Sequence, residues 1–262
     1  MWSERTVAAA ARRARWVAAL LLIIGMSAAA EAWAQERTST QLWANLTLGH
    51  PRSERLYFEL DFEPKIQLSG GEKWRNFDVT PLAEFYPADW LDLTAEATVG
   101  FTHQLSGLNT FEVTPRIGVR VHLFQTAWGH LPHPERLPAS RLGLGNLLRL
   151  ESRHFWYSGD RGSSHEWRLR NRAEAKLALN HDSLSQDGTL YLIADAEFYF
   201  PLGDELPERF STKFRGRAGL GYRIDYRMRL EFLYVRYGSR STHEEDFEKD
   251  ADIFDFRLKI FF

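Results

Sequence analysis

The chain ends in Phe254-Asp255-Phe256-Arg257-Leu258-Lys259-Ile260-Phe261-Phe262, and this stretch decides the fold class. One parity is apolar and comprises Phe254, Phe256, Leu258, Ile260 and Phe262. The other parity carries Asp255, Arg257 and Lys259, with Phe261 as the exception. Because successive side chains of a strand point to opposite faces, these residues predict a strand with one apolar and one charged face. A helix would mix the two sets.

The same alternation recurs along most of the chain. It is clearest in Leu56–Leu68, Leu91–Phe101 and Phe111–Leu123. Further strands are predicted at Gln41–Gly49, Trp74–Tyr86, Arg141–Trp156, Glu166–Asn180, Leu190–Phe200, Lys213–Ile224, Tyr226–Tyr237 and Ile253–Phe262. Segments of this length exceed the usual soluble strand of about 5–6 residues and suit a tilted membrane crossing of about 9–11. The expected fold is therefore all-β, a transmembrane antiparallel meander β-barrel.

An internal repeat supports the assignment of hairpins. Gln67-Leu68-Ser69-Gly70 recurs as Gln104-Leu105-Ser106-Gly107, and Phe77-Asp78-Val79-Thr80-Pro81 resembles Phe111-Glu112-Val113-Thr114-Pro115. Proline cannot donate a hydrogen bond to a neighbouring strand. Three prolines on the apolar parity therefore predict bulges or weakened pairing at Pro64, Pro81 and Pro115.

The carboxyl-terminal strand resembles the closing strand of bacterial outer-membrane β-barrels. That resemblance implies a signal that the barrel-assembly machinery reads during biogenesis, carried by Phe256, Leu258, Ile260 and Phe262. The amino end agrees with export from a Gram-negative cytoplasm. Arginines precede a short apolar run, Val17 to Gly25, and the segment ends Ala32-Trp33-Ala34, a pattern typical of a cleaved signal peptide. We expect a signal peptide at residues 1–34 and one outer-membrane barrel domain at residues 35–262.

Composition excludes several classes of protein. The 262 residues include no Cys, so disulfides and thiolate metal sites are impossible, and a net charge of -2 does not favour nucleic acid as a partner. The nine His are scattered without ligand spacing, so no metal and no cofactor is expected. A mean hydropathy of -0.39 does not exclude a membrane barrel, because charged lumen residues cancel the lipid-facing ones in the average.

The strand number is the weakest step. Eleven segments are predicted, whereas single-chain bacterial barrels have even numbers. Ten or twelve strands are both compatible with the sequence, and twelve is favoured. With the last strand descending to the periplasm, Gln41–Gly49 runs the wrong way for a periplasmic amino end.

The charged parity predicts a filled lumen. Acids dominate the first half of the chain and arginines the second. The predicted ion-pair ladder comprises Glu59, Asp61, Glu63, Glu96, Arg149, Glu151, Arg153, Arg168, Arg170, Arg172, Glu174, Arg215, Arg217, Arg227, Arg229 and Glu231. Arginine stays charged and binds carboxylates through two parallel hydrogen bonds, so these side chains are expected to fill a small barrel with ion pairs. Structural filling and a narrow polar conduit are both compatible with the pattern.

Several short motifs together resemble an outer-membrane barrel family catalogued only as a domain of unknown function. They are Gln41-Leu42-Trp43, Arg149-x-Glu151-x-Arg153, Arg168-x-Arg170-x-Arg172-x-Glu174, Glu197-x-Tyr199 and Arg217-x-Gly219-x-Gly221-Tyr222. The resemblance spans most of the mature chain. It implies location and architecture and transfers no catalytic residue.

The expected function is that of an integral outer-membrane barrel with a charge-filled lumen, in a structural or narrow-pore role and without catalysis. Outer-membrane lipids and lipopolysaccharide are the expected partners, and the oligomeric state stays open. One alternative is an outer-membrane lipid hydrolase, which needs a Ser and a His two apart on one strand face. His103 and Ser106 are three apart. Ser152 and His154 share a parity, but Glu151 lies on the other.

A second alternative is a soluble periplasmic barrel that turns its apolar parity inward around a ligand. Strand length, the terminal Phe and the aromatics near strand ends favour lipid outside instead, with aromatic girdles at both interfaces. These aromatics are Trp43, Trp74, Trp90, Trp156 and Trp167.

Overall fold

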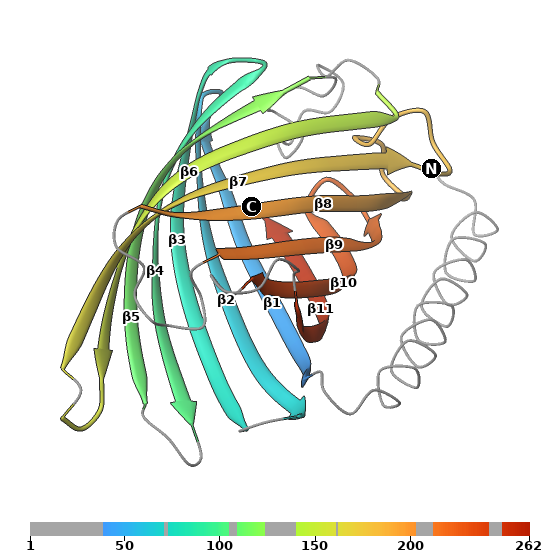
Figure 1. The fold of residues 1–262 in the computed structure, drawn as a ribbon. Coiled ribbons are helices and arrows are strands. Elements are labelled where there is room, and N and C mark those ends of the chain that lie inside the picture. Colours follow the sequence, from blue (N-terminus) through green and yellow to red (C-terminus); the bar gives the residue numbers. More distant parts are fainter. Residues whose placement is uncertain are drawn as a thin grey trace. The chain divides into compact units, whose positions relative to one another are not determined.

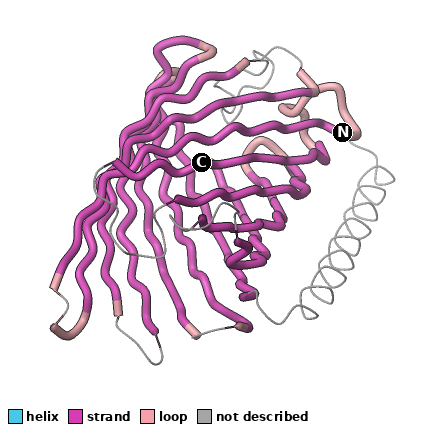
Figure 2. The backbone as a smooth tube through the Cα atoms, in the orientation of Figure 1, coloured by secondary structure: helices cyan, strands magenta, loops and turns pink. Residues whose placement is uncertain are grey.

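The computed structural model describes residues 39–70, 73–104, 109–123, 140–160, 162–202, 212–240 and 248–262. The predicted signal peptide and Ser106 lie outside the described residues. Every regular element in this part of the chain is a strand, as Figure 2 shows in magenta. None of the described residues form a helix long and apolar enough to cross a membrane.

Eleven described strands close into one barrel, which lies within Ser39–Phe262 (Figure 1). They are β1 (Ser39–Ser53), β2 (Leu56–Ser69), β3 (Trp74–Ala88), β4 (Leu91–Gln104), β5 (Thr110–His122), β6 (Leu142–Tyr157), β7 (Ser163–Ala178), β8 (Thr189–Leu202), β9 (Thr212–Arg223), β10 (Met228–Arg240) and β11 (Glu248–Phe261). All eleven predicted segments are strands. The observed number lies within the predicted range of ten to twelve, although it differs from the favoured twelve.

The odd strand number is closed by one parallel pair. Each strand from β1 to β11 pairs antiparallel with the next in a meander, and β1 then pairs parallel with β11, with Leu46 opposite Leu258. In a closed ring with an odd number of strands, the strand directions cannot alternate all the way round. One pair of adjacent strands must therefore be parallel. Twelve strands were favoured because single-chain bacterial barrels have even numbers; here β1 runs in the same direction as β11, and the eleven predicted segments close without a further strand.

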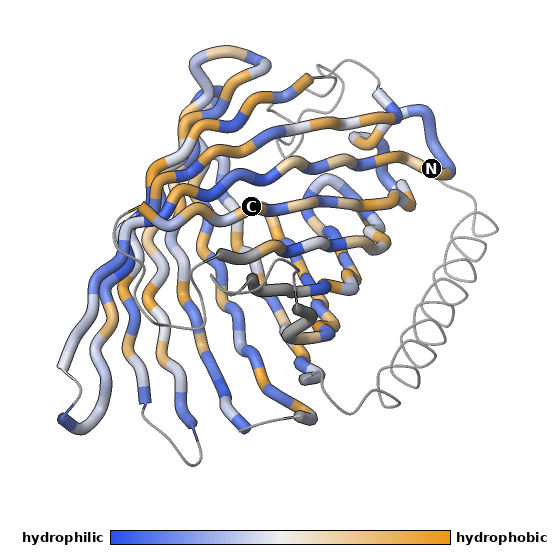
Figure 3. The backbone as a smooth tube through the Cα atoms, viewed as in Figure 1, coloured by the Kyte–Doolittle hydropathy of each residue, from blue (hydrophilic) through white to orange (hydrophobic). Residues whose placement is uncertain are grey.

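The two faces of the barrel have opposite chemistry. Large apolar side chains are exposed on the outer face; examples are Phe58, Phe77, Phe101, Ile117 and Phe256. The opposite parity is charged and buried, including Arg149, Glu151, Arg170 and Glu197. Figure 3 shows the resulting alternation of blue and orange along the strands. The described strands therefore turn their apolar set outward, the reverse of what a soluble ligand-binding barrel requires.

The three prolines interrupt strand pairing without shifting it. Pairing stops opposite Pro64 on the β1 side, at Pro81 on the β4 side and at Pro115 on the β6 side, and then resumes in the same register. This is the weakened pairing that the missing N–H predicts. Bulges do not occur at these positions. The register shifts of β1–β2 lie between Thr40 and Gln41 and between Pro51 and Ser53, and that of β3–β4 lies between Phe85 and Ala88.

Two apolar clusters pack inside the barrel. At the end where the chain terminates, Phe261 packs against Tyr57 in a buried cluster that also contains Tyr86. This explains why the aromatic Phe261 lies on the otherwise charged face of its strand: that face points into the barrel, where the ring packs in the aromatic cluster. The second cluster contains Trp43, Ala178, Leu184, Tyr191, Ile193, Leu233, Val235, Ala251 and Ile253. The prediction that Trp43 belongs to an outward-facing aromatic girdle was therefore wrong, since its ring is only 8% exposed and packs inside the barrel.

Candidate functional site: the ion-paired interior

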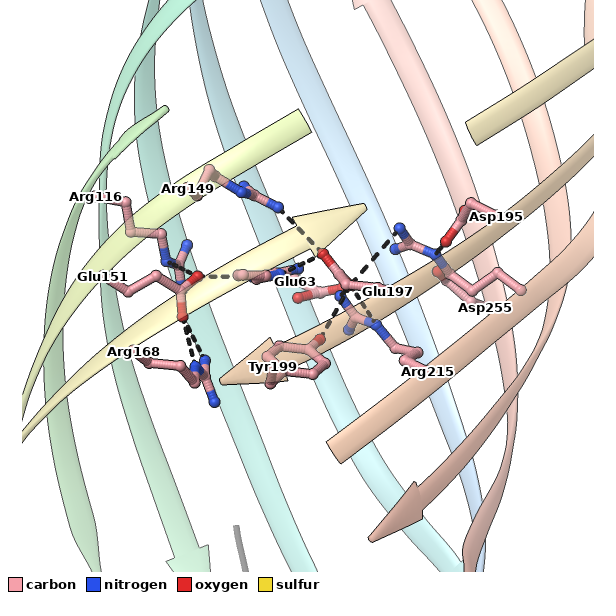
Figure 4. A network of polar contacts seen from close by, with 12 residues as sticks. Glu63, Arg116, Arg149, Glu151, Arg168, Asp195, Glu197, Tyr199, Arg215 and Asp255 are labelled. Atoms are coloured by element: carbon pink, nitrogen blue, oxygen red, sulfur yellow. Dashed lines mark hydrogen bonds and ion pairs between the residues drawn. The ribbon is translucent and has the colours of Figure 1, made fainter. Parts of the chain in front are cut away.

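The centre of the interior is built on Glu151 of β6 and Glu197 of β8. Both carboxylate side chains are 0% exposed. Glu151 accepts hydrogen bonds from Arg168, at 2.8 and 2.5 Å, and from Arg170 Nη1, at 3.0 Å (Figure 4). Arg116 Nε of β5 forms a further ion pair with Glu151 at 3.0 Å. Three guanidinium groups from two neighbouring strands thus surround one carboxylate.

Glu197 is surrounded in the same way. Arg170 and Arg215 both donate to it, the latter also through Nε at 2.9 Å. The Tyr199 hydroxyl donates at 3.0 Å, and Arg149 Nη2 lies 3.5 Å away. Arg170 therefore bridges the two central carboxylates: its guanidinium donates through Nη1 to Glu151 and through Nε to Glu197.

The central network continues to both sides along the polar parity. Arg149 donates to Glu96 of β4, two strands away from its own strand. Arg217 Nε lies 2.7 and 2.8 Å from the two oxygens of Asp195. Because an unpaired buried charge costs several kcal/mol, a chain that places this many charges inside a barrel must pair them.

Smaller groups of ion pairs line the rest of the interior. Lys65 joins Glu63 and Asp78, at 2.7 and 2.6 Å. Arg153 joins Glu112 and Glu166, at 3.1 and 3.3 Å. The remaining groups are Arg120 with Glu84, Asp92 and nearby His122, and Arg257 and Lys259 with Asp255 and Glu231. The pairing therefore extends around most of the barrel wall.

Charges from distant strands also act on one another. The Glu63 carboxylate of β2 is within electrostatic reach of Arg215 of β9 and of Arg257 of β11. Glu231 of β10 interacts electrostatically with Lys176 of β7 in the same way. β2 and β9 are four positions apart in a ring of eleven, so these interactions cross the lumen. Charged side chains from well-separated parts of the barrel wall therefore act on one another inside the barrel.

Most residues of the predicted ladder lie in this interior, with individual differences. Glu59 and Asp61 accept hydrogen bonds from Tyr57 and Thr47, at 2.6 and 2.5 Å. Glu174 pairs with Lys176, at 2.9 Å. Arg229 lies over the Phe261 ring, 4.8 Å from its centroid.

Two arginines of the predicted ladder differ from the expected pairing. No carboxylate among the described residues lies within ion-pairing distance of Arg172, which faces the interior beside Glu174. Arg227 was wrongly included in the lumen ladder. It precedes the first residue of β10, is exposed, and stacks on Tyr226 at 5.1 Å. Its backbone carbonyl still accepts a hydrogen bond from Phe261 N–H at 2.7 Å, so Arg227 lies at the rim of the barrel, outside the ion-paired interior.

The predicted ladder also omitted members of the network. The central Glu197 is one of them, and Arg116, Asp195 and Arg257 also form ion pairs in the interior. Each has the same parity as its predicted neighbours, so the alternation was a sufficient signal for finding them.

A separate polar group lies on the outer face of the β6–β7 hairpin. Ser152, His154 and His165, which we call the outer triad, are on the same parity as the exposed Leu148, Trp156 and Trp167. Glu151 faces the interior, as its parity predicted. His165 was missed because it comes from the next strand, and register brings it opposite His154. Among the described residues, no group of three or more potential metal ligands is present.

The structure defines a closed eleven-stranded β-barrel with an apolar outer face and an ion-paired interior. The sequence matches the profile of a family described as a protein of unknown function, DUF2490, over residues 40–248. Since the match covers most of the chain, the protein belongs to this family. No curated protein and no solved structure matches the chain.

Proposed function

We propose that this protein is an integral outer-membrane β-barrel with a lumen closed by its own ion pairs. One observation carries the proposal: apolar side chains are exposed on the outside of the described barrel, and charged side chains are buried inside it. A water-soluble barrel with this arrangement would expose a large contiguous apolar surface. In a bilayer the same surface faces lipid, as in other membrane barrels.

Strand length and aromatic placement support the same location. The strands contain 12 to 16 residues, enough for tilted strands to cross the hydrocarbon region. Trp90, Trp156 and Trp167 are about half exposed and lie near strand ends, where interfacial aromatics of membrane barrels are found. Outer-membrane phospholipids and lipopolysaccharide would then be the lasting partners, and the barrel-assembly machinery a transient one.

A structural role in the membrane is the function that the interior supports best. The central carboxylates are paired with arginines, and Phe261, Tyr57 and Tyr86 form a buried aromatic cluster inside the barrel. We propose no catalysis in this interior. A narrow conduit remains the second candidate because the wall is charged throughout, and conductance measurements decide between the two.

Fractionation of cells that express the full chain tests the membrane location. We expect the protein in the outer-membrane fraction, extracted only by detergent, with faster gel mobility before boiling than after it. Release into the soluble fraction by osmotic shock, with identical mobility before and after heating, would refute the proposal.

A further inference from the structure

The outer triad is a hydrogen-bonded constellation of a hydroxyl and two imidazoles. Ser152 Oγ lies 3.0 Å from His154 Nε2 and 2.9 Å from His165 Nε2. A hydroxyl has one proton, so Oγ donates to one imidazole and accepts an N–H from the other. The imidazole that accepts is placed to remove the hydroxyl proton, which is the arrangement that activates a serine nucleophile.

The surrounding rings hold both imidazoles in place. The His154 ring stacks on Trp156, at 6.3 Å between centroids, and its centroid lies 4.4 Å from that of His165. His165 meets Trp167 edge to face, at 5.6 Å. Register fixes the layout, since Ser152 lies opposite Trp167 and His154 opposite His165. The geometry thus rests on two paired strands and does not depend on a loop.

The position of this group requires an explanation, because the rest of the outer face is largely apolar. If the barrel spans a membrane, as proposed above, the outer triad faces lipid. Polar groups in that position are costly and mark functional sites in membrane proteins. Tryptophan concentrates at the boundary between headgroups and acyl chains. With Trp156 and Trp167 beside it, the outer triad lies at the depth where membrane lipids carry their ester bonds.

We propose that the outer triad is a hydrolytic site for the acyl esters of membrane lipids, with Ser152 as nucleophile and His154 as general base. This inference rests on the proposed membrane location. It departs from the expectation, drawn from the sequence, that the protein has no catalytic activity. Glu151, on the opposite face of the same strand, takes no part in it.

The reaction needs only the ester and water. Ser152 Oγ forms a bond to the ester carbonyl carbon while His154 Nε2 takes its proton. The bond to the leaving alkoxide breaks, and the alkoxide receives that proton as the alcohol departs. Water then attacks the acyl-serine, giving one proton to His154 and its oxygen to the released fatty acid. The returning proton restores Ser152, and no oxidant or reductant is involved.

His165 is assigned a positioning role. Its N–H holds Ser152 Oγ so that the hydroxyl proton points to His154. His165 is exposed, whereas Ser152 is only 8% exposed, so His165 is the more outward member of this hydrogen-bonded pair. Loss of His165 should therefore lower kcat through misdirection of the hydroxyl and leave KM nearly unchanged. His165→Gln, which restores an N–H donor, should recover part of the lost rate.

The test uses the full chain purified in detergent micelles. Its substrates are a p-nitrophenyl acyl ester, a glycerophospholipid in mixed micelles, and lipopolysaccharide, which separate the two lipid sources. A fluorophosphonate probe reports the nucleophile independently. We expect esterase activity and labelling in the wild type, both lost in Ser152→Ala. His154→Ala should reduce the rate by roughly 100-fold to 10,000-fold. Ser163→Ala, an exposed serine on the same hairpin, is the matched control.

Three outcomes would overturn the assignment. The first is a heat-modifiable wild type that shows neither hydrolysis nor labelling, and the second is activity that is unaffected in Ser152→Ala. The third is activity lost on chelation with EDTA, which would point to a metal held by the two histidines. Heat modifiability is measured on every variant to show that it is folded. The assay is performed in detergent and does not depend on location in cells. A folded, heat-modifiable protein without activity would refute this site and leave the proposed membrane location standing.

Discussion

Glu197 is the single residue on which the charge pairing of the interior depends most. Its carboxylate is contacted by Arg149, Arg170, Arg215 and the Tyr199 hydroxyl. We predict that Glu197→Gln, which keeps the shape and removes the charge, lowers the free energy of unfolding by about 3–5 kcal/mol, because several buried guanidinium groups lose their counter-charge. Urea unfolding of the barrel in micelles or liposomes measures the change.

Asp160→Asn is the control for Glu197→Gln. Asp160 is an exposed carboxylate in the turn between β6 and β7, where neutralisation should change stability by less than about 0.5 kcal/mol. Equal effects of the two substitutions would show that the interior is well hydrated and that its ion pairs contribute little.

Gly221 is required by the size of a neighbouring side chain. A Cβ at Gly221 would lie 2.3 Å from Cζ of Tyr191, whose ring crosses the next strand at this point and whose hydroxyl donates to Glu231 at 2.9 Å. We predict that Gly221→Ala destabilises the barrel by about 1–3 kcal/mol through overpacking. Thermal or urea unfolding of the purified protein measures it.

Gly145 provides the comparison for Gly221. A Cβ there meets its nearest atom, the Val121 carbonyl oxygen, at an ordinary 3.6 Å, so Gly145→Ala should be neutral or slightly stabilising. Combining Gly221→Ala with Tyr191→Leu should recover much of the loss. Failure of that rescue would mean that the backbone of β9, and not the Tyr191 ring, excludes the methyl group.

At the scale of the element, alternation was sufficient to predict every strand and the face of nearly every side chain. The prolines were read correctly as places of weakened pairing, because a missing N–H acts locally. Arg227 was misread because alternation continues past a strand end, and only the hydrogen bonds at the turn determine where β10 begins. Local sequence patterns therefore predict that a strand exists better than they predict the residues at which it begins and ends.

The last two residues of the chain have different predicted roles: Phe261 packs inside the barrel, and Phe262 belongs to the predicted assembly signal. Phe261 is 5% exposed and packs on Tyr57, whereas Phe262 is 68% exposed. We predict that Phe261→Ala destabilises the purified barrel by about 3–5 kcal/mol. Phe262→Ala should leave its stability within about 0.5 kcal/mol but reduce the amount assembled in cells. Urea unfolding and quantification of the outer-membrane fraction measure the two effects.

The two variants are each other's controls. A normal cellular level of Phe262→Ala would contradict the role of the terminal strand as an assembly signal. Unchanged stability of Phe261→Ala would contradict the inward position of that ring.

The seam between β1 and β11 is the element that the sequence could not specify. Leu46 and Leu258 are partners across the parallel pair. The native chain has no Cys, so paired substitutions give a clean background. We predict that Leu46→Cys with Leu258→Cys forms a disulfide, because partnered strand residues are close enough for the bond. Mobility on a non-reducing gel detects it.

A displaced pair controls the seam experiment. Leu46→Cys with Phe254→Cys lies four residues out of register, beyond the reach of a disulfide. Cross-linking of the displaced pair and not of the partnered pair would show that the barrel closes in another register.

At the scale of the whole molecule, the sequence predicted the content of the interior but not its pairing. Parity placed Arg170, Glu151 and Glu197 on one face. That Arg170 joins the two carboxylates depends on the registers of β6, β7 and β8 together, which no local pattern encodes. The outer triad had the same obstacle, since Ser152 and His154 share a strand but His165 reaches them only through the pairing of β6 with β7.

The proposed closure of the lumen is a property of the whole barrel, because nearly every strand contributes charged side chains to the interior. We predict that the purified protein, inserted in planar bilayers, gives no discrete conductance steps at about 0.15 M or about 1 M salt. Buried ion pairs are screened far less than exposed ones, so the higher salt should not release them. A known open porin in the same bilayers serves as the control. Regular steps that grow with salt would show that the charged wall encloses a water-filled path, and the interior would then be a conduit whose ion pairs set its selectivity.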